Sequence, residues 1–229
     1  MIYPMDPTFL LLIPALLLAV FAQMKVKSSF AKYSQIYAAR GVSADTVSRI
    51  LLDNFGLQKV KVERVPGSLT DHYDPRSKVL RLSDSVSGNS SIAAIGVAAH
   101  EVGHAIQDKE GYAPLRFRNA LVPLANIGST AAFPLFLIGL FMSMEPLLNI
   151  GIILFAGVVL FHVITLPVEF DASARALKLL GNTGTLTKQE LGGAKRVLTA
   201  ASLTYIAATV MALAQLLRLL ILANGRRSN

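Results

Sequence analysis

The chain has 229 residues, of which 53% are hydrophobic and 16% are charged, and its mean hydropathy is +0.52. Soluble domains carry about 25% charged residues, and here the apolar excess lies in long blocks, which indicates a membrane protein. The absence of cysteine excludes disulfides, thiol catalysis and cysteine-ligated zinc. Lys and Arg flank the apolar blocks, so membrane topology explains the net charge of +8 and no nucleic-acid partner is expected.

The first apolar block runs from Pro7 to about Met24. The residues before it, Met1–Asp6, include no basic side chain, whereas Lys25, Lys27 and Lys32 follow it. A signal peptide has the opposite charge order. We therefore predict an uncleaved N-terminal transmembrane anchor over residues 1–24.

A less apolar region, residues 25–118, follows the anchor and predicts a small α+β part. Helical spacing of apolar residues, with Ser43 as cap and Gly56 as stop, predicts the first helix. Residues 58–65 and 78–82 have strand patterns. A mostly apolar helix is predicted from about Ser90 to Asp108.

Three more apolar blocks cover residues 119–144, 147–168 and 197–223, each near the roughly 20 residues that cross a bilayer. They predict a transmembrane pair over 119–168, a cytoplasmic helix and capped helix start over 169–196, and a fourth transmembrane helix with a tail over 197–229. The predicted fold class is a mainly α membrane protein with four transmembrane helices and a small α+β, zincin-like cytoplasmic part.

The basic residues also predict the orientation of the spans. Residues 25–118 and 170–196 are rich in Lys and Arg, whereas the connector 143–148 has none. The positive-inside rule predicts that both long segments are cytoplasmic. Arg226 and Arg227, near the C-terminus, do not fit this orientation, because it places the C-terminus outside. A multi-pass protein of the cell membrane is expected, with its active site on the cytoplasmic side.

The last predicted helix of the 25–118 region contains His100-Glu101-Val102-Gly103-His104. Histidines four apart on a helix lie on the same face, where both imidazoles can bind one Zn²⁺. Glu101 falls beside such an ion and can act as general base on a water molecule. The motif predicts a zinc hydrolase.

A catalytic zinc site keeps three protein ligands and one open position, so a third ligand is required. Glu169 and Asp171 lie where the third predicted span reaches the cytoplasm, and His162 lies inside that span. Glu169 is the most economical candidate. Asp171 and His162 remain open alternatives.

These residues resemble the YugP-type neutral zinc metallopeptidases of bacterial membranes over nearly the whole chain. The resemblance rests on the stretches 99–107 (AHEVGHAIQ) and 169–173 (EFDAS). A more distant similarity connects the chain to HtpX and the CAAX prenyl endopeptidases. The resemblance implies a membrane-embedded zincin, with one Zn²⁺ per chain bound by His100, His104 and Glu169 and with Glu101 as general base.

The sequence departs from the more distant relatives at Ser173, where they carry an aspartate that supports a ligand histidine. Asp171 or Ser173 itself is expected to take over that role. The tetrahedral oxyanion formed in peptide hydrolysis also needs a donor. Candidates for this transition-state donor are His72, Tyr73, Tyr112 and Arg175.

The predicted function is peptide-bond hydrolysis, with membrane proteins or their cytoplasmic flanks as substrates. The analogy with HtpX implies a role in membrane protein quality control. The strand at 78–82 could align an extended substrate if it lies at a sheet edge, or could be an interior strand without that role.

Two other functions remain open: a non-catalytic zinc-binding scaffold that docks partners, and a metal transporter with His162 and Glu169 along its path. A structural zinc site would need a fourth ligand, such as His162 or His72. Small residues in the second and third predicted spans permit close helix packing, within one chain or between chains. An oligomer or an accessory membrane partner is therefore also open.

Overall fold

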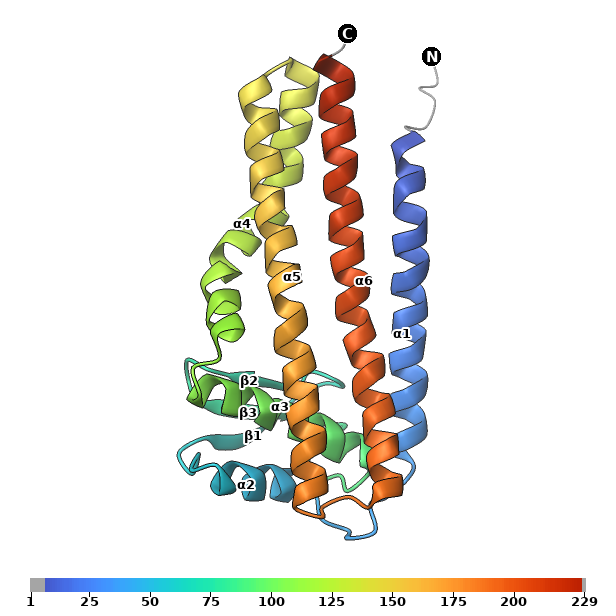
Figure 1. Ribbon diagram of the computed structural model, residues 1–229, viewed down its shortest axis with the longest axis vertical. Helices are drawn as coiled ribbons and strands as arrows, with labels where there is room; N and C mark the ends of the chain where they lie inside the picture. The colour runs from blue at the N-terminus through green and yellow to red at the C-terminus, as the bar shows by residue number, and fades with distance from the viewer. Residues whose placement is uncertain (1–6, 228–229) are drawn as a thin grey trace. The chain divides into compact units, whose positions relative to one another are not determined.

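The computed structural model describes residues 7–227 (Figure 1). The chain divides into two compact units. The membrane unit comprises the described parts of Met1–Ala22, Arg116–Leu166 and Thr204–Asn229. The site unit comprises Gln23–Leu115 and Pro167–Leu203.

Within residues 7–227, four helical segments are long and apolar enough to cross a bilayer. They are η1 with α1 (Pro7–Leu12 and Ile13–Ser34), α4 (Ala113–Met142), α5 (Glu145–Asn182) and α6 (Lys188–Arg227). The mean hydropathies of their most apolar windows are 2.2, 1.7, 2.5 and 2.1. The four predicted apolar blocks lie in these helices, which extend well beyond them. The predicted fold class is confirmed as mainly α, with four candidate membrane spans and a small α+β part.

Within the membrane unit, glycines let α4 and α5 pack backbone against backbone. A Cβ atom at Gly128 would lie 2.6 Å from the carbonyl oxygen of Leu154, and one at Gly151 would lie 2.8 Å from that of Ala132. Only a residue without a side chain fits at such a distance. These small residues therefore serve packing within one chain, one of the two uses that the sequence leaves open.

The site unit contains α2 (Ala44–Asn54), β1 (Lys61–Val65), β2 (His72–Asp74), β3 (Val79–Ser83) and α3 (Ile92–Lys109). Ser43 caps α2 as predicted, because its hydroxyl accepts a hydrogen bond from the amide of Thr46 at 3.4 Å. Ser91 caps α3 in the same way through Ala94, at 3.3 Å. The predicted helices and both predicted strands are present, with bounds shifted by one to three residues.

The three strands form a sheet in the order β1-β3-β2. β1 runs parallel to β3 and β2 runs antiparallel to it. β3 is thus paired on both sides, so the hypothesis that residues 78–82 form a substrate-aligning edge strand is wrong. β2 was not predicted, because three residues are too few to show an alternating pattern.

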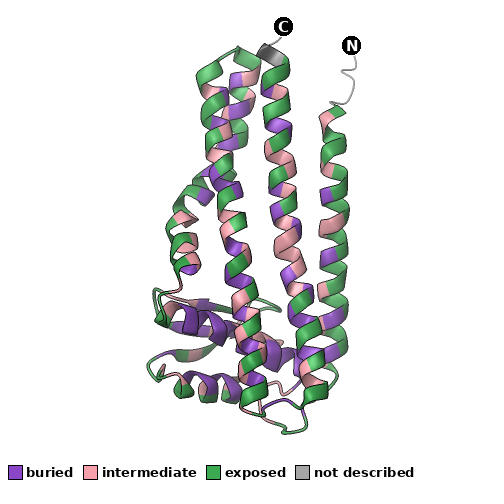
Figure 2. Cartoon of the chain, in the orientation of Figure 1, coloured by how far each residue is buried: buried purple, intermediate pink, exposed green. Residues whose placement is uncertain are grey.

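α3 lies at the centre of this unit and is buried along almost its whole length (Figure 2). It packs against α2 and against β2 and β3. Small residues such as Ala94, Ala98 and Ala99 are fully buried and let these neighbours approach closely. A buried helix fixed on several sides is a rigid support for side chains that must hold one geometry.

Candidate metal centre

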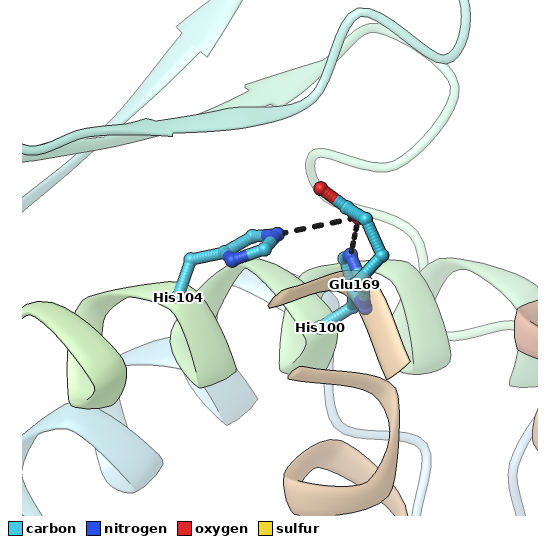
Figure 3. Close-up of side chains that lie close together, drawn as sticks. All are labelled: His100, His104 and Glu169. Atoms are coloured by element: carbon cyan, nitrogen blue, oxygen red, sulfur yellow. Dashed lines mark hydrogen bonds and ion pairs between the residues drawn. The ribbon is translucent and has the colours of Figure 1, made fainter. Parts of the chain in front are cut away.

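His100 and His104 project from the same face of α3 (Figure 3). Their ring centroids lie 4.7 Å apart and the ring planes are inclined by 83°. The spacing of four residues places the two side chains one helical turn apart. The rings are therefore neighbours that can offer nitrogen atoms to a common point.

Glu169 reaches the two rings from α5. Its Oε2 atom lies 3.2 Å from Nε2 of His100 and 3.6 Å from Nε2 of His104. One ligand atom from each of the three residues lies within 4.8 Å of the others. Glu169 is 3% exposed, so its carboxylate is turned away from solvent.

This arrangement fits a divalent cation. Two ligand atoms of a tetrahedral zinc site with bonds of 2.0–2.1 Å lie about 3.3 Å apart. The two separations between histidine nitrogens and the Glu169 carboxylate, 3.2 and 3.6 Å, are of that size. A buried carboxylate needs a positive partner. In this site, a protonated imidazole or a bound cation can supply the positive charge.

The outward-facing Nδ1 atom of each histidine also has a partner. Nδ1 of His100 lies 3.1 Å from the hydroxyl of Ser173, and Nδ1 of His104 lies 3.0 Å from Oε1 of Gln107. An oxygen partner at Nδ1 favours the tautomer that leaves the Nε2 lone pair free for a metal. Ser173 was expected to have such a role, whereas Gln107 was overlooked, although three residues after His104 is a same-face spacing.

Glu101 lies on α3 between the two histidines and is 7% exposed. Burial disfavours the charged form of His104, but the hydrogen bond to Glu169 and the negative charge of Glu101 more than offset this. The pKa of His104 is therefore raised above its ordinary value. Glu101 is close enough to act electrostatically on the site while lying outside the group of three ligand atoms.

The alternative third ligands do not belong to the three-residue group. His162 belongs to the membrane unit, where its carbonyl accepts a hydrogen bond from Thr209 at 3.4 Å. The Asp171 carboxylate accepts hydrogen bonds from Gln107 and Arg175 and is not a member of the three-residue group.

The candidate oxyanion donors also have other partners. His72 contacts Thr70 and Arg81 on the sheet, and the hydroxyl of Tyr73 donates to Asp108. The guanidinium of Arg175 binds Asp171 and Glu110 and lies over the ring of Tyr112. Among the described histidine and carboxylate side chains, His72 does not join the three-residue group. The donor role of Tyr73, Tyr112 and Arg175 stays a prediction.

Comparison with known proteins identifies the family of the chain. The family described as "Putative neutral zinc metallopeptidase" matches residues 8–224. Over 220 residues the chain is 47% identical to "Putative membrane protease YugP" of Bacillus subtilis (strain 168), covering 96% of this chain and 98% of that protein. No solved structure matches the chain. The family resemblance noted from the motif residues is confirmed.

Proposed function

The chain belongs to this neutral zinc metallopeptidase family, and we propose that it is a membrane-embedded, zinc-dependent endopeptidase that cuts membrane-associated proteins at the cytoplasmic face. The observation that carries the proposal is the convergence of His100, His104 and Glu169 on one point. Three protein ligands with an open fourth position are typical of catalytic zinc, whereas structural zinc has four. We infer one Zn²⁺ per chain at this group.

The proposed division of labour follows from the positions of the side chains. A bound zinc ion would polarise the scissile carbonyl and acidify a water molecule. Glu101 would accept a proton from the attacking water as the resulting hydroxide adds to the carbonyl carbon. It would then deliver that proton to the leaving amine as the C–N bond breaks. His100, His104 and Glu169 would hold the ion, and Ser173 would orient His100 through its Nδ1 atom.

The proposed location rests on charge. Lys25, Lys27 and Lys32 follow the first apolar block and Arg116 precedes the second. By the positive-inside rule, these charges support a cytoplasmic location of the site unit. The site residue Glu169 lies two residues after Pro167, where the site unit begins on α5. Substrates would then be membrane proteins or their cytoplasmic flanks, and membrane protein quality control would be the process served.

The discriminating experiment replaces the proposed base. Purified full-length protein in lipid nanodiscs, loaded with Zn²⁺, would be tested for cleavage of an unfolded reporter polypeptide such as casein. Glu101→Gln should retain zinc and lose cleavage by a factor of about 10²–10⁴, the contribution of general acid–base catalysis. Glu63→Gln, which removes an acid from β1, is the matched control and should cleave at the parent rate.

Two results would overturn the proposal. Cleavage by Glu101→Gln at the parent rate would exclude Glu101 as base. Absence of cleavage by the parent, both of casein and of membrane proteins captured by Glu101→Gln, together with stoichiometric zinc, would favour a non-catalytic zinc-binding scaffold.

A further inference from the structure

Gln107 lies on α3, three residues after His104, and its side chain is fully buried. Its Oε1 atom lies 3.0 Å from Nδ1 of His104. Its Nε2 group donates to the carbonyl of Val168 and to Oδ2 of Asp171, both at 2.8 Å. Both amide protons and the amide oxygen therefore have partners, as a buried polar side chain requires.

These partners determine which way the amide faces. A backbone carbonyl and a carboxylate are acceptors only, so the NH₂ group must face Val168 and Asp171. The amide oxygen then faces His104, and the hydrogen bond requires the proton of that ring to be on Nδ1. The Nε2 atom of His104, which lies 3.6 Å from Oε2 of Glu169, is then the ring nitrogen that can supply its lone pair to a metal ion.

The acceptor that orients Gln107 is itself held in place. Nε of Arg175 lies 2.5 Å from Oδ2 of Asp171, and Nη1 of Arg175 lies 2.6 Å from Glu110. Charge-assisted hydrogen bonds of this kind are stronger than neutral ones. The chain of contacts from Glu110 through Arg175 and Asp171 thus keeps an acceptor opposite the NH₂ group of Gln107.

Gln107 also holds the third ligand. Val168, whose carbonyl it binds, immediately precedes Glu169 on α5. One side chain is therefore hydrogen-bonded both to a ligand histidine of α3 and to the backbone beside the ligand carboxylate of α5, 61 residues further along the chain.

We propose that Gln107 is a positioning residue, which fixes the tautomer of His104 and holds the α5 segment of Glu169 at the site, so that the affinity for Zn²⁺ depends on it. The inference rests on the proposed metal site but not on proteolysis.

The test compares Gln107→Met with the parent in full-length protein in nanodiscs. Methionine has a similar length but neither the oxygen acceptor nor the NH₂ donors. Loss of a hydrogen-bond partner behind a ligand costs about 10–100-fold in metal affinity, so Zn²⁺ and Co²⁺ dissociation constants from chelator competition should weaken by that factor. The visible absorption of bound Co²⁺, which reports ligand geometry, should also change.

Gln189→Met, the same change at an exposed position of α6, should leave both readouts at parent values. A Gln107→Met protein with parent affinity and an unchanged Co²⁺ spectrum would overturn the proposal. If this variant does not fold, ¹⁵N NMR of the zinc-loaded parent decides. A proton on Nδ1 of His104 is expected, and ligation through Nδ1 would refute the inference.

The two proposals can fail separately. Cleavage by Glu101→Gln at the parent rate, with weakened metal binding in Gln107→Met, would remove the mechanism and keep the positioning role. Unchanged metal binding in Gln107→Met, with loss of cleavage in Glu101→Gln, would remove the positioning role and keep the mechanism.

Discussion

Gly103 of α3 and Ala172 of α5 are in backbone contact. A Cβ atom at Gly103 would lie 2.7 Å from the carbonyl oxygen of Ala172 and 3.1 Å from its Cα atom. The glycine lies immediately before His104, and Ala172 lies three residues after Glu169. The missing side chain therefore sets the distance between the helix that carries both histidines and the helix that carries the carboxylate.

Gly103→Ala should disrupt the metal centre, although Gly103 is not one of the proposed ligands. The added methyl group must push α5 away from α3, at a cost of about 1–3 kcal/mol in the free energy of unfolding. We expect a lower unfolding temperature and a weaker Zn²⁺ dissociation constant. Gly192→Ala is the control: a Cβ there meets nothing within 4 Å, so stability should be unchanged or improved by about 0.5–1 kcal/mol. Equal metal affinity in Gly103→Ala and the parent would contradict this account.

Glu169→Gln should lose the metal. The substitution keeps the size of the side chain but removes the charge 3.2 Å from Nε2 of His100 and 3.6 Å from Nε2 of His104. Zinc per chain, measured by mass spectrometry after dialysis, should fall well below one. Glu145→Gln, at the other end of α5, should stay at the parent value. Undiminished stoichiometry in Glu169→Gln would remove Glu169 from the ligand set.

Ser173→Ala should weaken metal binding more mildly. It removes the hydroxyl 3.1 Å from Nδ1 of His100 but leaves all three proposed ligands in place. A loss in zinc affinity of about tenfold is expected, the lower end of the range for such partners. Ser173→Thr retains a hydroxyl and should recover most of that loss. Equal affinities for Ala and Thr at this position would show that the hydroxyl does not matter.

Gly151→Ala should destabilise the membrane unit without affecting metal affinity. A Cβ atom there would lie 2.8 Å from the carbonyl oxygen of Ala132, so α4 and α5 must separate locally, at a cost of about 1–3 kcal/mol. Gly151 belongs to the membrane unit, whereas the proposed ligands belong to the site unit. Thermal unfolding and chelator competition on the same sample would measure the two effects. Loss of both together would mean that the units are energetically coupled.

Removal of the metal should destabilise the protein reversibly. A ligand that binds only the folded state adds about 2.7 kcal/mol to the free energy of unfolding when its free concentration is about 100 times its dissociation constant. Chelation should therefore lower the unfolding temperature, and Zn²⁺ should restore it. In Glu169→Gln the same treatment should have little effect, and a shift as large as that of the parent would locate the stabilising metal elsewhere.

Local sequence determined the parts of this protein that depend on near neighbours. Apolar length fixed the four spans, because about 20 residues are needed to cross a bilayer whatever the partners are. Ser43 and the spacing of apolar residues determined α2 in the same way. The pair His100 and His104 could be assigned to one face because four residues make about one turn of a helix.

The tertiary structure alone decided what depends on distant segments. It brought Glu169, 69 residues after His100, to the histidines instead of His162 or Asp171. It also placed Gln107 between His104 and Val168, and it made β3 an interior strand. The spacing of residues along a chain predicts the relative directions of their side chains only within one helix or strand. The distance between α3 and α5 is set by packing, here by the contact of Gly103 with Ala172.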